Sequence, residues 1–289
     1  MRICTELRAI FICCLLAGSR ICTAAQPVDA SNAVTLAQKQ ITAYLEKLAD
    51  LHCTETVTQE KLSDNGHVMA SSSDKFDYLI MMSGDADDFQ LNESRVDEPG
   101  ERHKLISTPM LVTNGVATLL LVFHPYYRAG FNFETLPEEI VDGRPAIPIR
   151  FTHIPGGRTP AALALRGREY PLDLQGTAWL DKASQTVVKI EASLERDMSD
   201  VGLRSLSIHV EYKPETLPGQ PALMNLPTVA VVDVATPRQR WRNTHTFGNY
   251  RAFSAEIEQD PNVKVHQDKP AQDSDPKTDT GTQGASKVP

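Results

Sequence analysis

The sequence predicts a mainly β (α+β) fold that is built on a single curved antiparallel sheet. Three observations predict it. Residues 176–253 alternate apolar and polar side chains in several runs, which is the period of half-buried strands. A helical apolar stripe precedes all the strands. An apolar stretch of roughly 15 residues interrupts about ten strands and predicts an internal helix on the concave face of the sheet.

Length, composition and charge bound the domain organisation and the class of partner. The chain has 289 residues, of which 41% are hydrophobic and 23% charged, and a net charge of −8. This charge disfavours nucleic-acid binding, because neutralising phosphates requires clustered Lys and Arg. We expect a signal peptide at 1–25, one β domain at 32–258 and a disordered tail at 260–289, where apolar residues are scarce.

The N-terminus has the features of an export signal. Arg2 and Arg8 flank the start, 9–18 is apolar, and Thr23-Ala24-Ala25 fits a small-x-small cleavage site. The apolar run is too short to span a bilayer, although a retained anchor is the alternative. The arginine in Ser19-Arg20-Ile21 argues against lipidation at Cys22. The sequence therefore predicts a periplasmic or secreted protein with no transmembrane span in its mature form.

Cysteine usage follows from this signal. Cys53 is the only cysteine outside the segment expected to be removed, so the mature form has no intrachain disulfide and no Cys-based zinc site. We expect Cys53 to be a small buried hydrophobic residue, with a reactive thiol as the alternative.

The first helix follows the signal. Ser31 or Asn32 is a suitable N-cap, and polar residues occupy the side opposite the apolar stripe. The stripe consists of Val34, Ala37, Ile41, Leu45 and Leu48.

Strand signals follow at 54–59, 76–82 and 88–96, with a hairpin turn at 64–66. Residues 84–88 resemble half of a calcium loop, but the required glycine and the later glutamate are not at the right offsets, so we interpret them as a solvated turn.

The second helix is expected over 108–123. Thr108 is a usable cap and Pro109 suits the first helical position. The segment is apolar nearly all round, so we expect protein to enclose it, and it ends at His124-Pro125.

Strands resume after this helix. Their expected ranges are 131–134, 146–153, 170–174, 176–180, 186–194, 206–212, 228–234 and 238–247. In the strand at 186–194 we expect Val188, Ile190, Ala192 and Leu194 to share one face. In the last strand Trp241, Asn243, His245 and Phe247 face one way. Arg238, Arg240 and Arg242 face the other and either contact an anion or an acidic partner, or form a solvated face paired with Asp or Glu.

Two short patterns resemble a known family. One is Phe76 to Ile80 before Glu93-Ser94-Arg95, and the other is Gly176 to Asp181 before Val187 to Ile190. They resemble the periplasmic lipoprotein carrier family (LolA/LolB-like), which includes RseB-type domains, over 32–253. The resemblance implies an unclosed barrel around an apolar cavity for acyl chains, plugged by helices. The residues that we expect to line this cavity are Leu111, Val112, Val116, Leu119, Leu120, Phe123, Tyr78 and Trp179.

No catalytic, nucleotide-binding or metal-binding motif is present. The sequence has no G-x-S-x-G, H-E-x-x-H, G-x-x-x-x-G-K-[ST] or G-x-G-x-x-G, so we predict no cofactor and no metal. His124, with Tyr126, Tyr127 and Arg128, either lines a pocket mouth or stops the helix before a packed aromatic turn.

Three functions compete at this point. The first is an exported, non-enzymatic binding protein that holds a lipid or lipidated partner, as a lipoprotein carrier or an envelope sensor. The second is a structural module of a cell-envelope complex without a ligand. The third is a hydrolase that uses His124 or His153 with a nearby carboxylate, because the members of a triad need not be close in sequence.

Overall fold

The computed structural model describes residues 30–49, 51–83, 89–97, 110–113, 115, 117–217 and 223–252. The expected signal peptide, the turn at 84–88, the cap at Thr108 with Pro109, Val116 and the tail from 260 lie outside these residues. The helices are α1 (Ala30–Ala49), the 3₁₀ helix η1 (Ala117–Phe123) and the single turn α2 (Pro125–Arg128). The strands are β1 (Leu51–Leu62), β2 (Val68–Ser83), β3 (Gln90–Asp97), β4 (Phe131–Thr135), β5 (Glu139–Val141), β6 (Arg144–His153), β7 (Ala162–Leu165), β8 (Arg168–Pro171), β9 (Leu174–Asp181), β10 (Val187–Leu194), β11 (Ser205–Thr216), β12 (Leu223–Ala235) and β13 (Arg240–Ala252).

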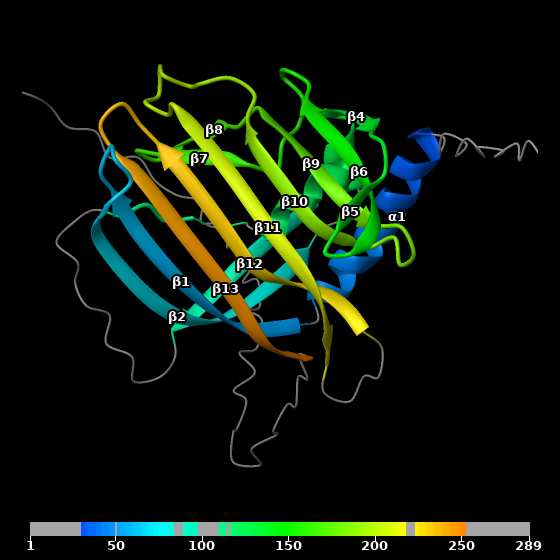
Figure 1. The fold of residues 1–289 in the computed structure, drawn as a ribbon. Coiled ribbons are helices and arrows are strands. Elements are labelled where there is room, and N and C mark those ends of the chain that lie inside the picture. The colour runs from blue at the N-terminus through cyan, green and yellow to red at the C-terminus, as the bar shows by residue number, and fades with distance from the viewer. Residues whose placement is uncertain are drawn as a thin grey trace, which may run out of the picture. The chain divides into compact units, whose positions relative to one another are not determined.

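One large antiparallel sheet dominates the domain (Figure 1). Its strand order is β3-β2-β1-β13-β12-β11-β10-β9-β6-β4, with β5 added beside β6. The first and last strands of the domain therefore pair in the interior of the sheet, while β3 and β4 lie at its two ends. The β7–β8 hairpin forms a separate two-stranded sheet. The prediction of a mainly β fold with an antiparallel sheet that does not close into a barrel is confirmed.

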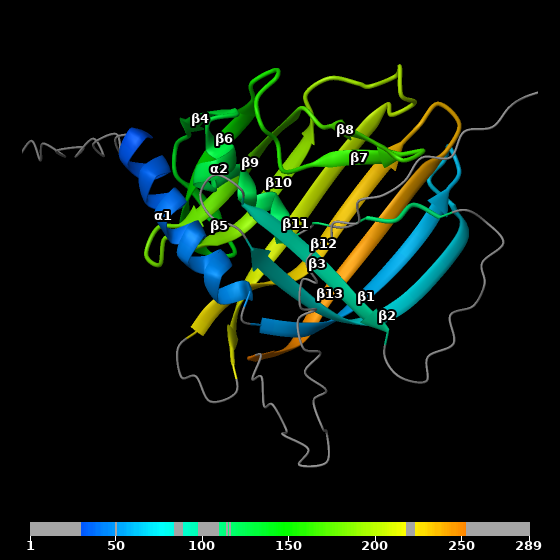
Figure 2. The ribbon, with the colours of Figure 1, turned by 180° about the vertical axis from the view of Figure 1, so that it is seen from behind.

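Helix α1 covers one face of the sheet, which we call the inner face (Figure 2). The whole expected apolar stripe is buried, from Val34 at 5% exposure to Leu45 at 0%. The helix contacts β1 and β2 toward one end of the sheet, β4 at the other end, and η1 between them. It begins at Ala30, one or two residues before the expected cap, a difference within the usual uncertainty of helix ends.

The prediction of a second helix is wrong over its first half. Residues Met110–Thr113 have no regular secondary structure, and only 117–123 is helical, as a 3₁₀ helix. The carbonyls of Leu111 and Thr113 accept hydrogen bonds from side chains of the sheet, so they are not used in an α-helical ladder. Leu119 to Phe123 are all buried, as expected for an apolar segment enclosed by protein.

The local turn chemistry explains two hairpins. Asp142 and Gly143 have φ of 49° and 76°, the left-handed pair that a two-residue turn between β5 and β6 requires. At the turn after β9, Asp181 Oδ1 accepts from the backbone N–H groups of Ala183 (3.0 Å) and Ser184 (2.8 Å). These bonds explain why an aspartate ends the pattern from Gly176 to Asp181.

A β-bulge in β10 reverses the face expected for Val188. Val187 pairs with Leu180 but Lys189 pairs with Trp179, so one extra residue enters β10 at this point. Val188 therefore packs with Trp179 and Ala146 in a small cluster separate from the main core. Ala178 and Leu180 belong to the main core, which places Trp179 on the outer face, away from the expected cavity.

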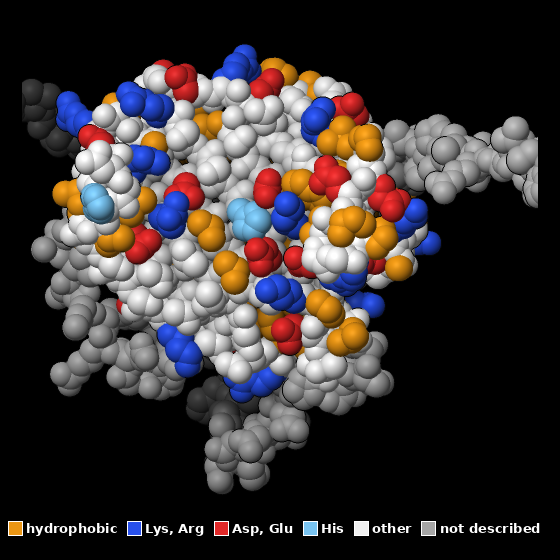
Figure 3. Space-filling view, viewed as in Figure 1, with side chains coloured by type: hydrophobic (Ala, Val, Ile, Leu, Met, Phe, Trp, Pro, Cys, Tyr) orange, Lys and Arg blue, Asp and Glu red, His pale blue; other side chains and the backbone are white. Residues whose placement is uncertain are grey.

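The outer face carries interspersed acidic and basic side chains (Figure 3). In β13 the predicted alternation is confirmed, with Arg240 and Arg242 exposed and Asn243 and His245 buried. Arg242 Nε donates to Asp233 Oδ1 across the strand pair at 2.9 Å, and Arg240 donates to the Asp64 carbonyl at 3.4 Å. Arg238 is exposed beside them. These contacts favour the solvated, paired interpretation of the arginine stripe.

Gly176 is a point of close approach between strands and gives a test of this packing. A Cβ at Gly176 would lie 2.1 Å from the Glu191 carbonyl oxygen and 2.5 Å from Phe151 Cζ. We expect Gly176→Ala to lower the free energy of unfolding by about 1–3 kcal/mol, because backbone must shift. Gly248→Ala is the matched control in β13, where a Cβ would meet nothing within 4 Å. Urea denaturation measures the free energy of unfolding of both variants. Equal values for Gly176→Ala and Gly248→Ala would contradict the close approach of β9 to β10 at Gly176.

Candidate functional site

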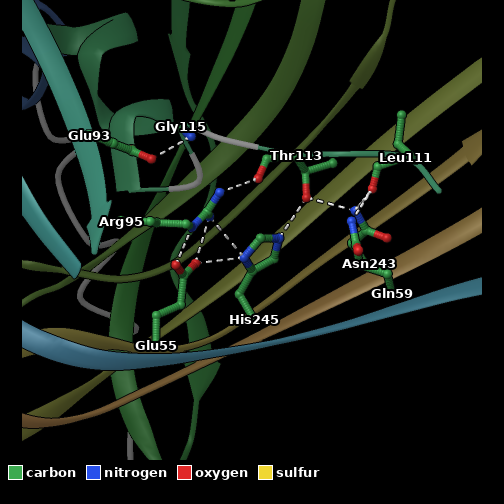
Figure 4. A network of polar contacts seen from close by, with 9 residues as sticks. All are labelled: Glu55, Gln59, Glu93, Arg95, Leu111, Thr113, Gly115, Asn243 and His245. Atoms are coloured by element: carbon green, nitrogen blue, oxygen red, sulfur yellow. Dashed lines mark hydrogen bonds and ion pairs between the residues drawn. The ribbon is translucent and has the colours of Figure 1, made fainter. Parts of the chain in front are cut away.

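A cluster of polar side chains lies on the inner face, where an apolar surface is expected. They come from three strands that are far apart in sequence and near one another in the sheet (Figure 4). The members are Glu55 and Gln59 from β1, Glu93 and Arg95 from β3, and Asn243 and His245 from β13. Local alternation directs them inward, since Glu55 lies between the buried residues Cys53 and Val57.

The Glu55 carboxylate is the centre of the cluster. It is 0% exposed, and both of its oxygens accept from Arg95, with Nη2 2.8 Å from Oε1. His245 Nδ1, also 0% exposed, lies 2.7 Å from Oε1. Burial by itself would raise the pKa of Glu55, but the hydrogen bonds and attraction from Arg95 and His245 hold it below its usual value. Glu55 is therefore a paired, buried carboxylate.

The segment of residues 110–113 and 115, which we call the strap, completes this cluster. The Leu111 carbonyl accepts from Gln59 Nε2 and from Asn243 Nδ2, the latter at 2.7 Å. The Thr113 carbonyl accepts from Arg95 Nη1 at 3.0 Å. Side chains of the sheet thus recognise the main chain of the strap, and they lay it across the inner face (Figure 4).

Thr113 also contributes its side chain. Its Oγ1 lies 2.7 Å from His245 Nε2 and accepts from Asn243 Nδ2 at 2.9 Å. Glu55, His245 and Thr113 are therefore hydrogen-bonded in series, carboxylate to imidazole to hydroxyl. This is the connectivity of a catalytic triad, although the imidazole is fully buried.

Glu93 holds the far end of the strap. Its Oε2 accepts from the Gly115 backbone N–H at 2.6 Å, while its buried Oε1 has no hydrogen-bond partner among the described residues. Burial raises the pKa of Glu93 to about 7, against the lowering effects of the Gly115 N–H and the Tyr78 hydroxyl. This carboxyl group is poised to change its charge near neutral pH.

The residues expected to line a cavity are dispersed. Leu119, Leu120, Phe123 and Tyr78 are buried in the main core, and Leu111 is half-buried. Val112 is 71% exposed and faces away from the core, because the strap is not helical. Trp179 lies on the outer face, as described above.

Described residues of the inner face line two small, mainly apolar voids of about 10 Å³ each. One lies between α1, η1 and Tyr212, and the other lies between Leu48, Cys53 and Tyr78. Such volumes hold at most one water molecule. The helices α1 and η1 thus fill the space beneath them.

Both histidines of the hydrolase hypothesis have structural partners. His124 caps α2, accepting from the Tyr126 N–H at 3.3 Å, and it stacks on Phe89. Burial lowers the pKa of His124. His153 Nδ1 lies 2.8 Å from Asp173 Oδ1, and Nε2 lies 3.1 Å from the Gly157 carbonyl. The arrangement at His124 matches a helix stop followed by a packed aromatic turn.

Cys53 is buried at 2% exposure with a free thiol, as expected. Burial raises its pKa to about 12, which disfavours the reactive thiolate. In the part of the chain that the structure describes, no three His, Cys, Asp or Glu side chains gather as metal ligands. None of the described helices has both the length and the hydropathy to cross a bilayer.

Comparison with known proteins finds similarity at the level of fold. No family model matches the chain, and no curated protein matches it. Among solved structures, a DUF1329 family protein from Desulfovibrio piger has 11% identity and a TM-score of 0.45, covering 78% of this chain and 94% of that one. A domain described as an outer membrane lipoprotein-sorting protein from Vibrio parahaemolyticus has 12% identity and a TM-score of 0.44, covering 81% and 97%.

A third structure is the MucA/MucB complex of Pseudomonas aeruginosa, with 11% identity and a TM-score of 0.21, covering 76% of this chain and 99% of that one. The resemblance is one of fold. The lipoprotein carrier type and its RseB-type relatives, which the sequence patterns resemble, are found among these neighbours. Identities of 11–12% and TM-scores below 0.5 concern the path of the chain and leave the chemistry of the site to its own side chains.

The raised pKa of Glu93 predicts a pH-dependent stability. The folded protein keeps the proton of Glu93 up to about pH 7, whereas the unfolded chain releases it near 4.5, so this group makes stability fall as pH rises through that window. Glutamine cannot ionise, and its carbonyl oxygen can still accept from Gly115. We expect Glu93→Gln to match the natural protein at pH 4.5 and to exceed its stability at pH 8 by at most about 3 kcal/mol.

Denaturant unfolding at the two pH values measures this difference. Glu169→Gln, at an exposed position on β8, is the matched control and should change the free energy of unfolding only slightly, and by the same amount at both pH values. A Glu93→Gln variant that is less stable than the natural protein at pH 8 would show that the ionised carboxylate is the favoured form.

Proposed function

We propose that this chain is an exported, non-enzymatic binding protein of the cell envelope. In this proposal the inner face of the sheet holds the acyl chain of a lipid, or a lipidated partner, in the place that the strap and η1 now occupy. The open ends of the sheet at β3 and β4 support it, because an unclosed sheet can admit an occupant without breaking a barrel.

The observation that carries the proposal is the way in which the inner face is filled. The strap has no regular structure, and η1 is a seven-residue 3₁₀ helix, a type that is uncommon beyond three or four residues. Neither segment contributes a strand to the sheet. Their removal therefore leaves the sheet pairing intact.

The free energies of burial are compatible with an exchange of η1 for an acyl chain. Withdrawing the five buried side chains of Leu119–Phe123 costs about 2 kcal/mol each, or roughly 10 kcal/mol. Burying an acyl chain of about 16 carbons contributes roughly 13 kcal/mol, at ~0.8 kcal/mol per methylene. The polar cluster suits the peptide of a lipidated partner, since it binds main-chain carbonyl and N–H groups that any peptide carries.

A second candidate function is hydrolysis, and the Glu55–His245–Thr113 series is the observation that favours it. Two features oppose it. Arg95 contacts both carboxylate oxygens of Glu55, and Thr113 Oγ1 already accepts from Asn243.

Loosening the strap tests the binding proposal. Gln59→Ala with Asn243→Ala removes both donors to the Leu111 carbonyl and so weakens the attachment of the strap to the sheet. Because the strap then competes less with a ligand for the inner face, we expect the variant to bind the methyl ester of cis-parinaric acid several-fold more tightly than the natural protein does. Fluorescence titration measures the affinity, and native mass spectrometry detects co-purified lipid. Thr244→Ala, next to Asn243 but with its side chain on the opposite face of β13, is the control and should bind as the natural protein does. Unchanged affinity in the double variant would refute the exchange.

Thr113→Val separates binding from hydrolysis. We expect the natural protein and the variant alike to hydrolyse p-nitrophenyl butyrate no faster than buffer. We also expect the variant to lose about 1–3 kcal/mol of stability, because His245 and Asn243 lose their bonds to the hydroxyl. Turnover by the natural protein that disappears in Thr113→Val would replace the binding proposal with the hydrolase.

A further inference from the structure

A second candidate site lies outside the inner face. A groove of about 580 Å³ runs between α1, α2 and β4. Val34, Phe131, Phe133 and Pro125 supply its apolar lining, and Arg128 and Gln38 supply polar groups. The groove uses no residue of the strap or of the polar cluster, and its volume is typical of small-molecule sites.

Arg128 is the distinctive residue of this groove. Its side chain is half-buried, and Nη1 donates to Gln38 Oε1 at 2.9 Å. Among the described arginines two others are half-buried, and both are paired, Arg95 with Glu55 and Arg144 with Asp181. Arg128 has no carboxylate within ion-pair distance in the described part of the chain. A partly desolvated guanidinium without an anion is unfavourable, so its surroundings suit an anionic group from outside.

The shape and polarity of the groove narrow the class of that anion. One guanidinium held by a neutral amide matches a single negative charge, and its planar fork matches a carboxylate. The lining beside it is aromatic and aliphatic, with Phe131 buried and Phe133 half-buried. None of the described residues that line the groove is acidic.

We propose that this groove binds a medium-chain aliphatic carboxylate, with the carboxylate on Arg128 and the hydrocarbon chain along Val34, Phe131 and Phe133. The site is separate from the exchange on the inner face. A neutral acyl ester tests the inner face, whereas this site requires the free carboxylate, so the two proposals fail independently.

Isothermal titration with decanoate tests the proposal, with acetate and 1-decanol as partial ligands that each lack one half of the molecule. We expect decanoate to bind one-to-one, and acetate and 1-decanol each to bind at least tenfold more weakly. Arg128→Gln should weaken decanoate binding at least tenfold, because it removes the charge. Arg204→Gln removes an exposed arginine on the loop before β11 and should leave binding unchanged.

A second variant tests the chain-binding half of the groove. Ala129 lines it with φ of −64° at the end of α2, so Ala129→Phe is compatible with the backbone and should occupy part of the groove. We expect it to abolish decanoate binding while acetate binding stays unchanged, with circular dichroism confirming the fold. No binding of decanoate, equal binding in Arg128→Gln, or acetate as tight as decanoate would each overturn the proposal.

Discussion

The buried carboxylate of Glu55 is the constraint from which the inner face is built. A charge with no solvent exposure must be paired, and Arg95 and His245 reach it from β3 and β13. Arg95 has a further N–H group that needs an acceptor, and the second ring nitrogen of His245 needs a hydrogen-bond partner. The carbonyl and the hydroxyl of Thr113 meet these two needs, so the strap cannot be an α-helix at this point. A helix over the same residues would direct those carbonyls to its own backbone.

This constraint divides the inner face into two regions with different tolerances. The apolar region beneath α1 and η1 is held by burial, which is non-directional and accepts another hydrocarbon of similar volume. The polar region recognises main-chain groups at fixed positions, so it accepts only a chain that presents carbonyl and N–H groups in the same spacing. The strap lies on the polar region and η1 on the apolar region, so a ligand that replaced both would need an apolar part and a peptide-like part.

The sequence predicts correctly those structural features that depend only on residues close together in the chain. The stripe of α1 and the alternation in β13 were predicted correctly because period and burial are read within one element. The bulge at Val188 was missed, because one inserted residue leaves the apolar pattern unchanged while reversing a face. The polar cluster joins Glu55 to His245, 190 residues apart, and only the pairing of β1 with β13 brings them together. Its local signal was an inward-facing glutamate between Cys53 and Val57.

The same cluster combines the connectivity of a triad with contacts that oppose hydrolysis. Hydrolysis by a triad needs a carboxylate that is free to stabilise the imidazolium, a hydroxyl that is free to attack, and N–H donors that are free to bind an oxyanion. Here Arg95 occupies both oxygens of Glu55, Asn243 donates to the Thr113 hydroxyl, and the nearby Gly115 N–H is bound to Glu93. Three groups that catalysis would require are therefore engaged in other contacts. The Glu–His–Thr series stabilises one conformation of the strap.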